Sequence, residues 1–332
     1  MGPPQKVLVT TAWLRPGDEV DRFLRSSGLE VQHSSFQDRD GTGVSLEDLV
    51  DDVDAVIAGT DAFTAELIDQ AERLRVIGRT GVGFDNIDVD AATRRGVAVC
   101  PTPGINRQSV AEYTIGLLLS VARRIPQSIS SVRSGGWEQS SGRELEGATL
   151  GVVGFGAIGR TVATLALAFG MRVVAFDPFV ASDGFDKVES VPLDTLLAQS
   201  DFITLHMSLS EDTRHMIDAA AFRKMKRGSY LINAARGGVV EEEALAEALR
   251  SGILAGAALD TTEIEPLPAD SPLRQFDNLL ITAHVGAATV ESRRRSGMLA
   301  AQAVVSVLGG TVPPQTVNPD FQHQLASQTG SR

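Results

Sequence analysis

Short runs of aliphatic and β-branched residues alternate along this chain with longer stretches whose apolar positions follow a helical period. Such runs, flanked by turn residues, predict buried strands, and the stretches between them predict helices. An early series of expected strands comprises residues 6–11, 30–33, 55–59, 75–78 and 97–100. A later series comprises residues 149–153, 172–176, 202–206, 230–233, 253–259 and 279–282. This alternation is typical of βαβ units, so we predict an α/β fold with two doubly wound parallel sheets.

Two longer helical patterns lie outside this alternation. Residues 109–124 carry apolar side chains at helical spacing and end just before Pro126, so this helix is expected to stop there and to join the two sheets. Residues 290–308 form a similar pattern that closes with two glycines. This second helix is expected to carry the chain back to the first domain.

The composition limits the partners and the compartment. The 332 residues suffice for about two domains, and 42 acidic against 30 basic side chains give a formal charge of -12. This charge repels phosphate backbones and anionic lipid surfaces, so neither nucleic acid nor a membrane is an expected partner. The single cysteine, Cys100, cannot form an internal disulfide, and the N-terminal residues lack the apolar core of a signal peptide. We therefore expect a cytoplasmic protein.

A glycine-rich loop follows the first strand of the later series. Gly154, Gly156 and Gly159 stand in the spacing GxGxxG between an apolar run and a helical stretch. In this context the first glycine permits a tight turn, the second lets a pyrophosphate approach the backbone, and the third lets helix and strand pack closely. The free N–H groups of the helix start attract the anion. A generic glycine-rich turn is the alternative, but the surrounding order of elements favours a dinucleotide site of Rossmann type.

The next expected strand ends at Asp177. A carboxylate at this place can accept hydrogen bonds from both hydroxyls of a ribose, and it repels a 2′-phosphate. The sequence therefore predicts NAD, rather than NADP, as the cofactor.

Three polar side chains stand beyond other strands of the later series, namely Arg236, Glu265 and His284. Ligands of open α/β sheets bind outside the carboxyl ends of the strands, so these side chains can reach one site. Oxidising a secondary alcohol requires a base for the hydroxyl proton and a cation for the carboxylate of the substrate. An imidazole oriented by a carboxylate supplies the base, and a guanidinium fork matches a carboxylate. The residues predict a hydride-transfer site without a metal.

The residues alone leave several of these assignments open. His206 also follows a strand and competes with His284 as the acid, and Glu263 competes with Glu265 as its partner. Arg236 precedes two glycines and could simply begin a turn. The other histidines are expected to be structural or at the surface: His33, His215 and His323.

A specific series of motifs extends over about residues 75–317. Its segments are Gly78-Arg79-Thr80-Gly81-Val82-Gly83-Phe84-Asp85-Asn86-Ile87-Asp88, Pro103-Gly104-Ile105-Asn106, Ala111-Glu112, 147–160, Asn233-Ala234-Ala235-Arg236-Gly237-Gly238-Val239-Val240, Ala258-Leu259-Asp260 with Glu265-Pro266, and Ala283-His284-Val285-Gly286-Ala287. In these segments the chain resembles the D-isomer-specific 2-hydroxyacid dehydrogenases, most closely their phosphoglycerate dehydrogenase branch. So many motifs in one order make the resemblance highly specific.

The resemblance implies that Arg236 binds the substrate carboxylate, that Glu265 is the partner of the histidine, and that His284 is the acid/base. It implies cofactor contacts, beside Gly154 and Gly159 of the glycine loop, from that loop and from other strand ends: Gly156, Ala157, Ile158, Asp177, His206, Thr213, Ala234, Asp260 and His284. It implies substrate contacts from Arg79, Val82, Gly83, Asn106 and Arg236. His206 thereby becomes a neighbour of the cofactor rather than the acid.

The resemblance also implies the domain organisation. Residues 1–103 and 289–332 are expected to form a discontinuous substrate domain, and residues 104–288 an NAD-binding Rossmann domain, both sheets being Rossmann- or flavodoxin-like. Relatives are usually dimers paired through their cofactor domains, so a homodimer is expected with helix 109–124 at the interface. No separate regulatory domain is expected after Pro319.

The chain departs from the family pattern at three places near the expected site. Ala283 stands where the family usually has a proline before the histidine, Thr261-Thr262 where it often has Val-Phe, and Met207-Ser208 where a proline follows His206. The first change is expected to loosen the loop that aims the imidazole. The other two reshape cofactor packing without removing a chemical group.

The substrate side departs from the phosphoglycerate branch. The loop at residues 59–62 contains Asp61, and Gln139 follows Trp137-Glu138, where that branch has arginines for a phosphate. Val82 stands where phosphite-oxidising relatives have a lysine. We therefore expect NAD-dependent interconversion of a small 2-oxoacid and its D-2-hydroxyacid. The alternatives are an oxidoreductase for D-3-phosphoglycerate or a phosphonate analogue, which Arg79 supports, and a binding protein that senses NAD(H), like the corepressors that share the fold.

Overall fold

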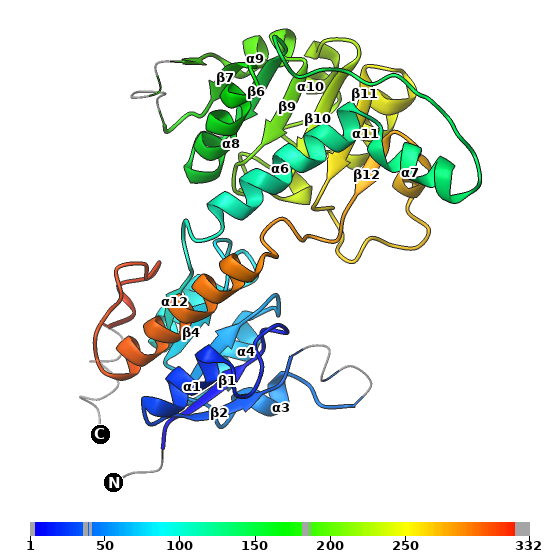
Figure 1. Ribbon diagram of the computed structural model, residues 1–332. Helices are drawn as coiled ribbons and strands as arrows, with labels where there is room; N and C mark the ends of the chain where they lie inside the picture. Colours follow the sequence, from blue (N-terminus) through cyan, green and yellow to red (C-terminus); the bar gives the residue numbers. More distant parts are fainter. Residues whose placement is uncertain (1–3, 36–38, 40–41, 181–184, 186, 323–332) are drawn as a thin grey trace. The chain divides into compact units, whose positions relative to one another are not determined.

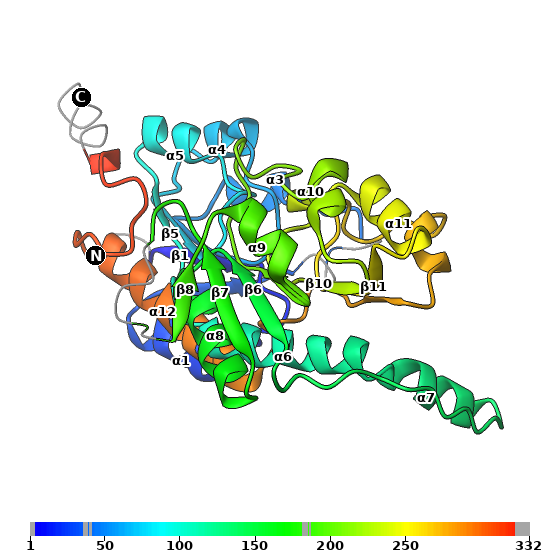
Figure 2. The same cartoon turned by 90° about the horizontal axis from the view of Figure 1, so that it is seen from above.

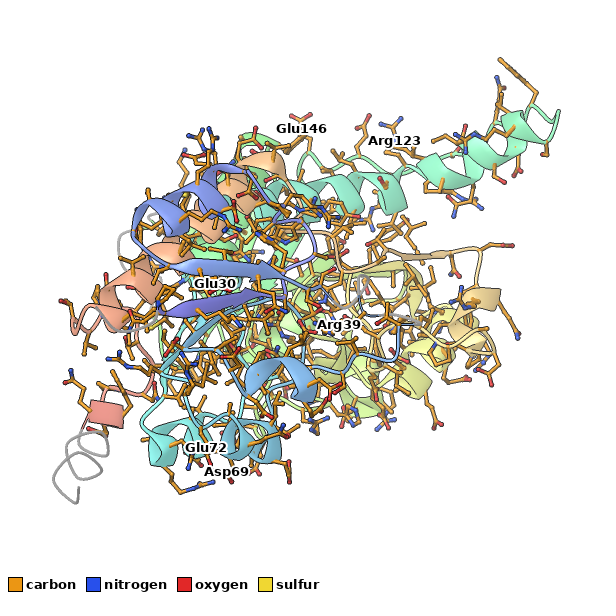
Figure 3. All side chains as sticks on the ribbon, turned by 90° about the horizontal axis from the view of Figure 1, so that it is seen from below. Glu30, Arg39, Asp69, Glu72, Arg123 and Glu146 are labelled. Carbon is orange, nitrogen blue, oxygen red and sulfur yellow. The ribbon has the colours of Figure 1, made fainter. Side chains whose placement is uncertain are left out.

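The computed structural model describes residues 4–35, 39, 42–180, 185 and 187–322. The chain divides into two compact units, one made of residues 1–106 and 289–332 and the other of residues 107–288. The chain leaves the first unit after Asn106, three residues later than the sequence placed the boundary, and returns to it at Thr289. Charged side chains such as Glu30, Asp69 and Glu72 lie exposed on the first unit (Figure 3). Within the described residues, the helices are too short or too polar to cross a membrane.

The first unit is built on a parallel sheet of five strands in the order β2-β1-β3-β4-β5. The strands are β1 (Lys6–Val9), β2 (Glu30–His33), β3 (Ala55–Ala58), β4 (Val76–Arg79) and β5 (Ala98–Cys100). One face packs against α1 (Glu19–Ser26) and α12 (Val290–Leu308). The other packs against α3 (Glu47–Val50), α4 (Ala65–Gln70) and α5 (Val89–Arg95). Figure 1 labels α3 and α4, and Figure 2 labels all three helices. This strand order is flavodoxin-like, as the sequence predicts.

The second unit is built on a parallel sheet of seven strands in the order β12-β11-β10-β9-β6-β7-β8. The strands are β6 (Thr149–Val153), β7 (Arg172–Phe176), β8 (Val188–Ser190), β9 (Phe202–Leu205), β10 (Ser229–Asn233), β11 (Leu254–Leu259) and β12 (Leu279–Ile281). Helices α6 (Arg107–Ala122) and α8 (Ala157–Ala168) cover one face. The other face carries α9 (Leu193–Gln199), α10 (Ala219–Lys224) and α11 (Glu242–Arg250) (Figure 1). The order reverses between β6 and β9, as in a Rossmann sheet, and the predicted fold class is confirmed.

Two elements of the second unit differ from the sequence prediction. The helix predicted over 109–124 is α6, and a further helix, α7 (Ile125–Arg133), begins after a break at Arg124, whose φ is +53°. Pro126 lies in the first turn of α7, where a missing N–H costs nothing, so it starts a helix as well as ending one. The short edge strand β8 was not predicted, because its sequence Val188-Glu189-Ser190 is too short and too polar to be recognised.

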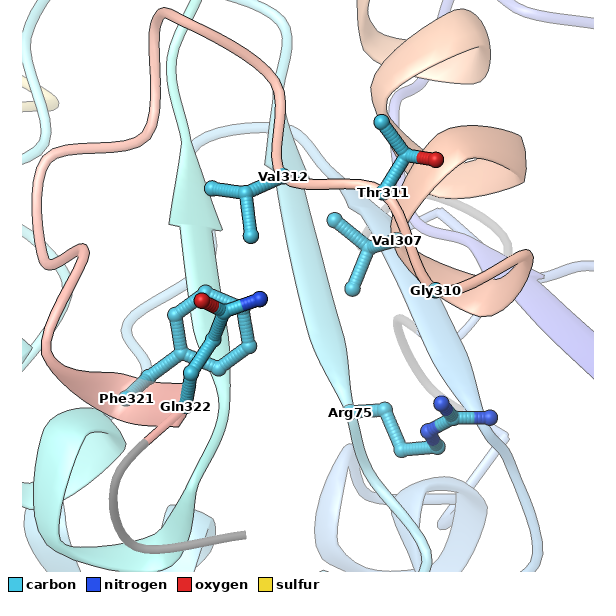
Figure 4. A pocket seen from close by; sticks show the side chains of 7 residues that line it. All are labelled: Arg75, Val307, Gly310, Thr311, Val312, Phe321 and Gln322. Atoms are coloured by element: carbon cyan, nitrogen blue, oxygen red, sulfur yellow. The ribbon is translucent and has the colours of Figure 1, made fainter. Parts of the chain in front are cut away.

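A small cavity of about 170 Å³ lies within the first unit (Figure 4). It is lined by Arg75, which directly precedes β4, by Val307 in the last turn of α12, by residues 310–312 after that helix, and by Phe321 and Gln322. The cavity therefore lies near the amino end of β4, whereas Arg79 ends the same strand at its carboxyl end. Ligands of parallel sheets bind at carboxyl ends, so this cavity is not a candidate substrate site.

Candidate active site

The glycine loop connects β6 to α8 in a geometry that excludes larger side chains at two of its three glycines. Gly154 has a φ of +91°, and a Cβ there would lie 2.7 Å from the backbone of His206. A Cβ on Gly159 would lie 2.1 Å from the carbonyl oxygen of Gly154. At Gly156, by contrast, an added Cβ would meet no described atom within 4 Å. Gly156 is also the N-cap residue of α8, without a side-chain cap, so the first-turn N–H groups near Ala157 and Ile158 are available for an anion.

Asp177 follows β7 and lies beside this loop. Its Oδ2 accepts a hydrogen bond from the N–H of Phe155 at 2.8 Å. Its Oδ1 accepts from the N–H groups of Phe179 at 2.9 Å and Val180 at 3.1 Å. Three backbone donors thus hold the carboxylate next to the loop that is expected to hold a pyrophosphate. A dinucleotide fits these residues, because an open glycine position, uncapped N–H groups and an acid stand together.

His206 lies directly after β9, where its backbone contacts Gly154. Burial lowers the pKa of this imidazole to about 3. The ring nitrogen Nε2 lies 2.8 Å from the hydroxyl of the buried Thr204. His206 is therefore neutral across the physiological range, which argues against a role as the proton-donating acid. Thr213 lies farther along the same loop, where its hydroxyl donates to the carbonyl of Ser208 at 2.8 Å.

His284 and Glu265 are in direct contact at the carboxyl ends of β12 and β11. The Nδ1 of His284 lies 2.8 Å from the Oε2 of Glu265, and both side chains are partly exposed. Burial raises the pKa of Glu265, but the hydrogen bond and charge of His284, the N–H of Thr262 and the charge of Arg236 outweigh it and lower that pKa below its ordinary value. The carboxylate therefore stays ionised and can orient the imidazole.

Glu263, the rival of Glu265, has other partners. Its Oε1 accepts from the N–H of Glu242 at 3.1 Å, and it lies 3.3 Å from the ring of His215. In return, the N–H of Glu263 donates to the carboxylate of Glu242 at 2.8 Å. Glu263 thus ties its loop to the start of α11, and Glu265 alone of the two contacts His284.

The backbone of His284 is held in an uncommon conformation, with a φ of +52°. The N–H of His284 donates to the carbonyl of Asp260 at 2.8 Å. The carboxylate of Asp260, which is 2% exposed, accepts from Thr282 Oγ1 and from the N–H groups of Val285 and Gly286 at 2.7–2.9 Å. Because both oxygens of Asp260 are engaged, this buried acid fixes the histidine loop. This set of bonds acts against the loosening expected from Ala283.

Arg236 follows β10, the neighbour of β11 in the sheet. Asn233 fixes the turn, because its Nδ2 donates to the carbonyl of Arg236 at 2.9 Å and its Oδ1 accepts from the N–H of Ala235 at 3.0 Å. The half-buried guanidinium is close enough to lower the pKa of Glu265. The carboxyl ends of β10, β11 and β12 therefore bring a guanidinium, a carboxylate and an imidazole to one edge of the sheet. Ala234, a predicted cofactor neighbour, precedes this turn.

The predicted substrate residues of the first unit lie at or after the carboxyl ends of its strands. Arg79 ends β4, and its guanidinium lies against the backbone of Gly81, where an added Cβ would approach Nη1 to 2.6 Å. Val82 is 37% exposed in the following loop, next to Gly83. Asn106 ends this part of the unit, and its Oδ1 is buried without a hydrogen-bond partner in the described part of the chain. Their contact with a substrate stays a prediction.

Two residues that make hydrogen bonds beside the site have no role assigned to them from the sequence. Asn233 was quoted within a motif, but no role was assigned to it. Thr262 was noted only as a departure from the family pattern. The available signal is chemical: each is a short polar side chain near a strand end, Asn233 as the last residue of β10 and Thr262 three residues after β11, where such side chains commonly bond to the backbone.

Comparison with known proteins identifies this arrangement. Residues 115–286 match the NAD-binding domain of the D-isomer specific 2-hydroxyacid dehydrogenases. The chain is 42% identical over 324 residues to a glyoxylate reductase of Thermofilum pendens, covering 92% of this chain and 95% of that protein. It is 42% identical over 309 residues to a D-3-phosphoglycerate dehydrogenase of Archaeoglobus fulgidus, covering 91% of this chain and 57% of that protein.

Solved structures agree with the sequence comparison. A protein of Thermus thermophilus superposes with a TM-score of 0.86 at 38% identity, covering 94% of this chain and all of that chain. The glycine loop, the acid after β7 and the histidine–carboxylate pair lie within the matched domain. The chain therefore belongs to the D-isomer specific 2-hydroxyacid dehydrogenases, a family of NAD-dependent oxidoreductases.

Proposed function

We propose that this protein is an NAD-dependent oxidoreductase that interconverts a small 2-oxoacid and its D-2-hydroxyacid. The contact of 2.8 Å between His284 and Glu265 carries the proposal, because it creates an oriented acid/base at the end of a dinucleotide-binding sheet. Arg236 on the neighbouring strand end supplies the cation that a carboxylate substrate requires.

The proton chemistry follows from the orientation of the imidazole. Nδ1–H donates to Glu265, so Nε2 is the nitrogen that exchanges a proton with the substrate oxygen. In reduction His284 donates that proton to the carbonyl oxygen, and in oxidation it accepts the proton of the hydroxyl group. The ionised Glu265 stabilises the charged imidazolium in both directions.

The substrate must be held while the proton moves. The guanidinium of Arg236 offers parallel N–H donors to the substrate carboxylate, and its charge polarises the adjacent carbonyl. Bound NAD would supply the hydride acceptor, and NADH the donor, for the carbon of the substrate.

The cofactor is proposed to be held by the glycine loop. Gly156 and the first turn of α8 would receive the pyrophosphate, and Asp177 would receive the ribose hydroxyls. Because Asp177 is charged and fixed by three backbone donors, it would repel a 2′-phosphate. NAD is therefore favoured over NADP.

The loop after β3 favours a substrate without a phosphate group. The Asp61 carboxylate pairs with the guanidinium of Arg39, which Figure 3 labels, and their side chains are only 6% and 8% exposed. This loop therefore presents a neutralised pair rather than a free cation. Gln139 in the second unit is also uncharged. D-3-phosphoglycerate remains the second candidate, because Arg79 stands at the end of β4 and a relative with that activity is 42% identical.

A panel of 2-oxoacids tests the proposed activity. With NADH we expect reduction of glyoxylate, hydroxypyruvate and pyruvate, and kcat/KM at least about tenfold lower for 3-phosphohydroxypyruvate. Each missing charge-assisted hydrogen bond to the phosphate is worth about 1.5–3 kcal/mol, and about 1.4 kcal/mol is a tenfold effect. NADPH, assayed in parallel, should be the poorer reductant. Loss of NADH absorbance is the measurement.

Two results of the panel would change the conclusion. Preference for the phosphorylated substrate would favour the phosphoglycerate activity. Binding of NADH without consumption of any 2-oxoacid would favour a binding protein that senses NADH.

We further propose that the protein is a cytoplasmic homodimer paired through its NAD-binding domains. The structure describes every residue of helix α7, and none of them is buried. The helix and the loop that follows it extend beyond the body of the second unit (Figure 2). Its apolar side chains Ile125, Ile129 and Val132 are 42–53% exposed, and Trp137 in the loop is 79% exposed. A groove of about 510 Å³ runs between α6 and β12 on the same unit. Exposed apolar surface of this kind marks a protein–protein interface.

The oligomeric state in solution tests this proposal. Light scattering is expected to give a mass twice the 35.2 kDa of one chain. Ile129→Asp, which places a charge on the exposed face of α7, should shift the protein towards the monomer. Val44→Asp, at a position 43% exposed in the first unit, is the matched control and should leave the dimer intact. A monomeric wild-type protein would contradict the proposal.

A further inference from the structure

The loop that carries Glu265 is held at each of its residues from 262 to 265. Glu263 is tied to Glu242 at the start of α11, and Glu265 contacts His284. Thr262 makes the contacts that connect these ends, through its backbone N–H, its carbonyl group and its hydroxyl group. These contacts place Thr262 between the turn of Arg236 and the carboxylate of Glu265.

The backbone of Thr262 is anchored on the turn that follows Arg236. A Cβ on Gly237 would lie 2.0 Å from both the carbonyl carbon and the carbonyl oxygen of Thr262. The two backbones therefore pack directly on each other, and only glycine fits at position 237. Thr262 itself is 8% exposed. This end of the loop cannot move independently of the turn that presents the guanidinium.

The side chain of Thr262 closes the loop. Its Oγ1 donates to the carbonyl oxygen of Ile264 at 2.8 Å, whereas the Ile264 side chain is 63% exposed and anchors little. The closed turn brings the N–H of Thr262 to within 3.2 Å of Oε1 of Glu265. The other oxygen, Oε2, contacts His284. The two carboxylate oxygens are thus held from opposite sides, by the loop and by the imidazole.

We propose that Thr262 is a positioning residue for the proton-transfer pair: its hydroxyl fixes the Ile264 carbonyl and thereby aims Glu265 at His284. The inference deepens the proposed function and rests on the role given there to His284. The hydrogen bonds between Glu263 and Glu242 cannot replace the hydroxyl of Thr262. They hold the loop only as far as Glu263 and do not orient Glu265.

Removing the hydroxyl is expected to displace Glu265 while the fold persists. In Thr262→Val a methyl group takes the place of Oγ1, and a carbon cannot approach a carbonyl oxygen to 2.8 Å without repulsion. The Ile264 carbonyl must move away, and Glu265 follows it. Misplacing a group that takes part in the reaction by about 1 Å can lower the rate about a hundredfold. We expect a smaller shift of the Glu265 carboxylate, and therefore a loss of kcat of about tenfold.

The test compares three variants. Thr262→Val should lower kcat about tenfold with KM unchanged, because Arg236 still binds the carboxylate. Thr262→Ser keeps the hydroxyl and should restore wild-type kcat. Thr164→Val is the matched control: its hydroxyl also donates to a backbone carbonyl, that of Arg160 at 2.9 Å, but it lies exposed in α8 rather than in the loop of Glu265, so kcat should not change.

The pH profile separates positioning from a general loss of stability. The charged groups that face Glu265 are His284 after β12 and Arg236 after β10, and neither is altered in Thr262→Val. Loss of the Thr262 N–H contact should raise the pKa of Glu265 towards its ordinary value. The low-pH limb of kcat/KM should therefore move to higher pH in Thr262→Val but not in Thr262→Ser.

A crystal structure of Thr262→Val gives a measurement that does not depend on turnover. The contact between Oε2 of Glu265 and Nδ1 of His284 should be lost or lengthened well beyond 2.8 Å. Should Thr262→Val fold poorly, Thr262→Ala removes the same hydroxyl without the added methyl contact. An unmoved carboxylate with unchanged kcat would overturn the role of Thr262. Failure of the wild-type protein to reduce any 2-oxoacid would instead overturn the proposed function.

Discussion

Replacing His284 by glutamine should lower kcat about a thousandfold while leaving the Kd for NADH within about twofold. Positioned acid/base groups contribute about 10²–10⁴ to rate, and a glutamine side chain cannot exchange a proton at the position of Nε2. Glutamine has a similar reach and can still bond to Glu265, so the loop held by Asp260 should keep its shape. Steady-state kinetics and fluorescence titration with NADH measure the two quantities.

A second histidine provides the control for this substitution. His215 is 41% exposed at its side chain, and it contacts Glu263 rather than Glu265. His215→Gln should retain kcat within about twofold. Normal turnover in His284→Gln would assign the acid to another side chain. Loss of NADH affinity in that variant would indicate a damaged fold rather than missing chemistry.

Replacing Arg236 by glutamine should lower kcat/KM about a thousandfold. Two charge-assisted hydrogen bonds to the substrate carboxylate are worth about 1.5–3 kcal/mol each, and about 1.4 kcal/mol corresponds to a factor of ten. The turn itself should survive the loss of the bond from Nη1 of Arg236 to the carbonyl of Ala235, because Asn233 holds the backbone of the turn at two points. Competition by a non-reacting carboxylate such as oxamate measures the loss of carboxylate binding directly.

Arg236→Lys distinguishes fork geometry from charge. A lysine ammonium keeps the positive charge but offers no planar pair of donors, so kcat/KM should lie between those of the wild type and the glutamine variant. Equal activity of the lysine variant and the wild type would show that charge alone is required. Unchanged kcat/KM in Arg236→Gln would remove this residue from substrate binding.

Local sequence patterns are sufficient to predict most of the fold and the glycine loop proposed to hold the cofactor. The glycine spacing, the preceding apolar strand and Asp177 lie close together in sequence, so their arrangement follows from one βαβ unit. Helix α7 was missed because Pro126 was interpreted only as the end of a helix. A proline serves equally in a first turn, and local sequence does not decide between the two.

The pairing proposed for proton transfer depends on contacts that sequence spacing does not contain. Glu263 and Glu265 differ by two positions, and only the course of their loop determines which of them reaches His284. His206 and His284 both follow strands, and burial beside Thr204 separates them by lowering the pKa of His206. The resemblance to a family points to Glu265, and the structure shows that Glu265 contacts His284. The physical reason for this contact lies in the tertiary structure.

The hydrogen bonds to Asp177 matter for any attempt to redesign the enzyme to use NADP, which carries a 2′-phosphate. Replacing Asp177 by a neutral residue would remove the repulsion between its carboxylate and the 2′-phosphate. The same change would leave the amide groups of Phe155, Phe179 and Val180 without their acceptor. Serine or threonine would be the better replacement, since a hydroxyl oxygen keeps one acceptor at that place while carrying no charge. Changing the coenzyme of this protein is therefore a problem of loop architecture as much as of electrostatics.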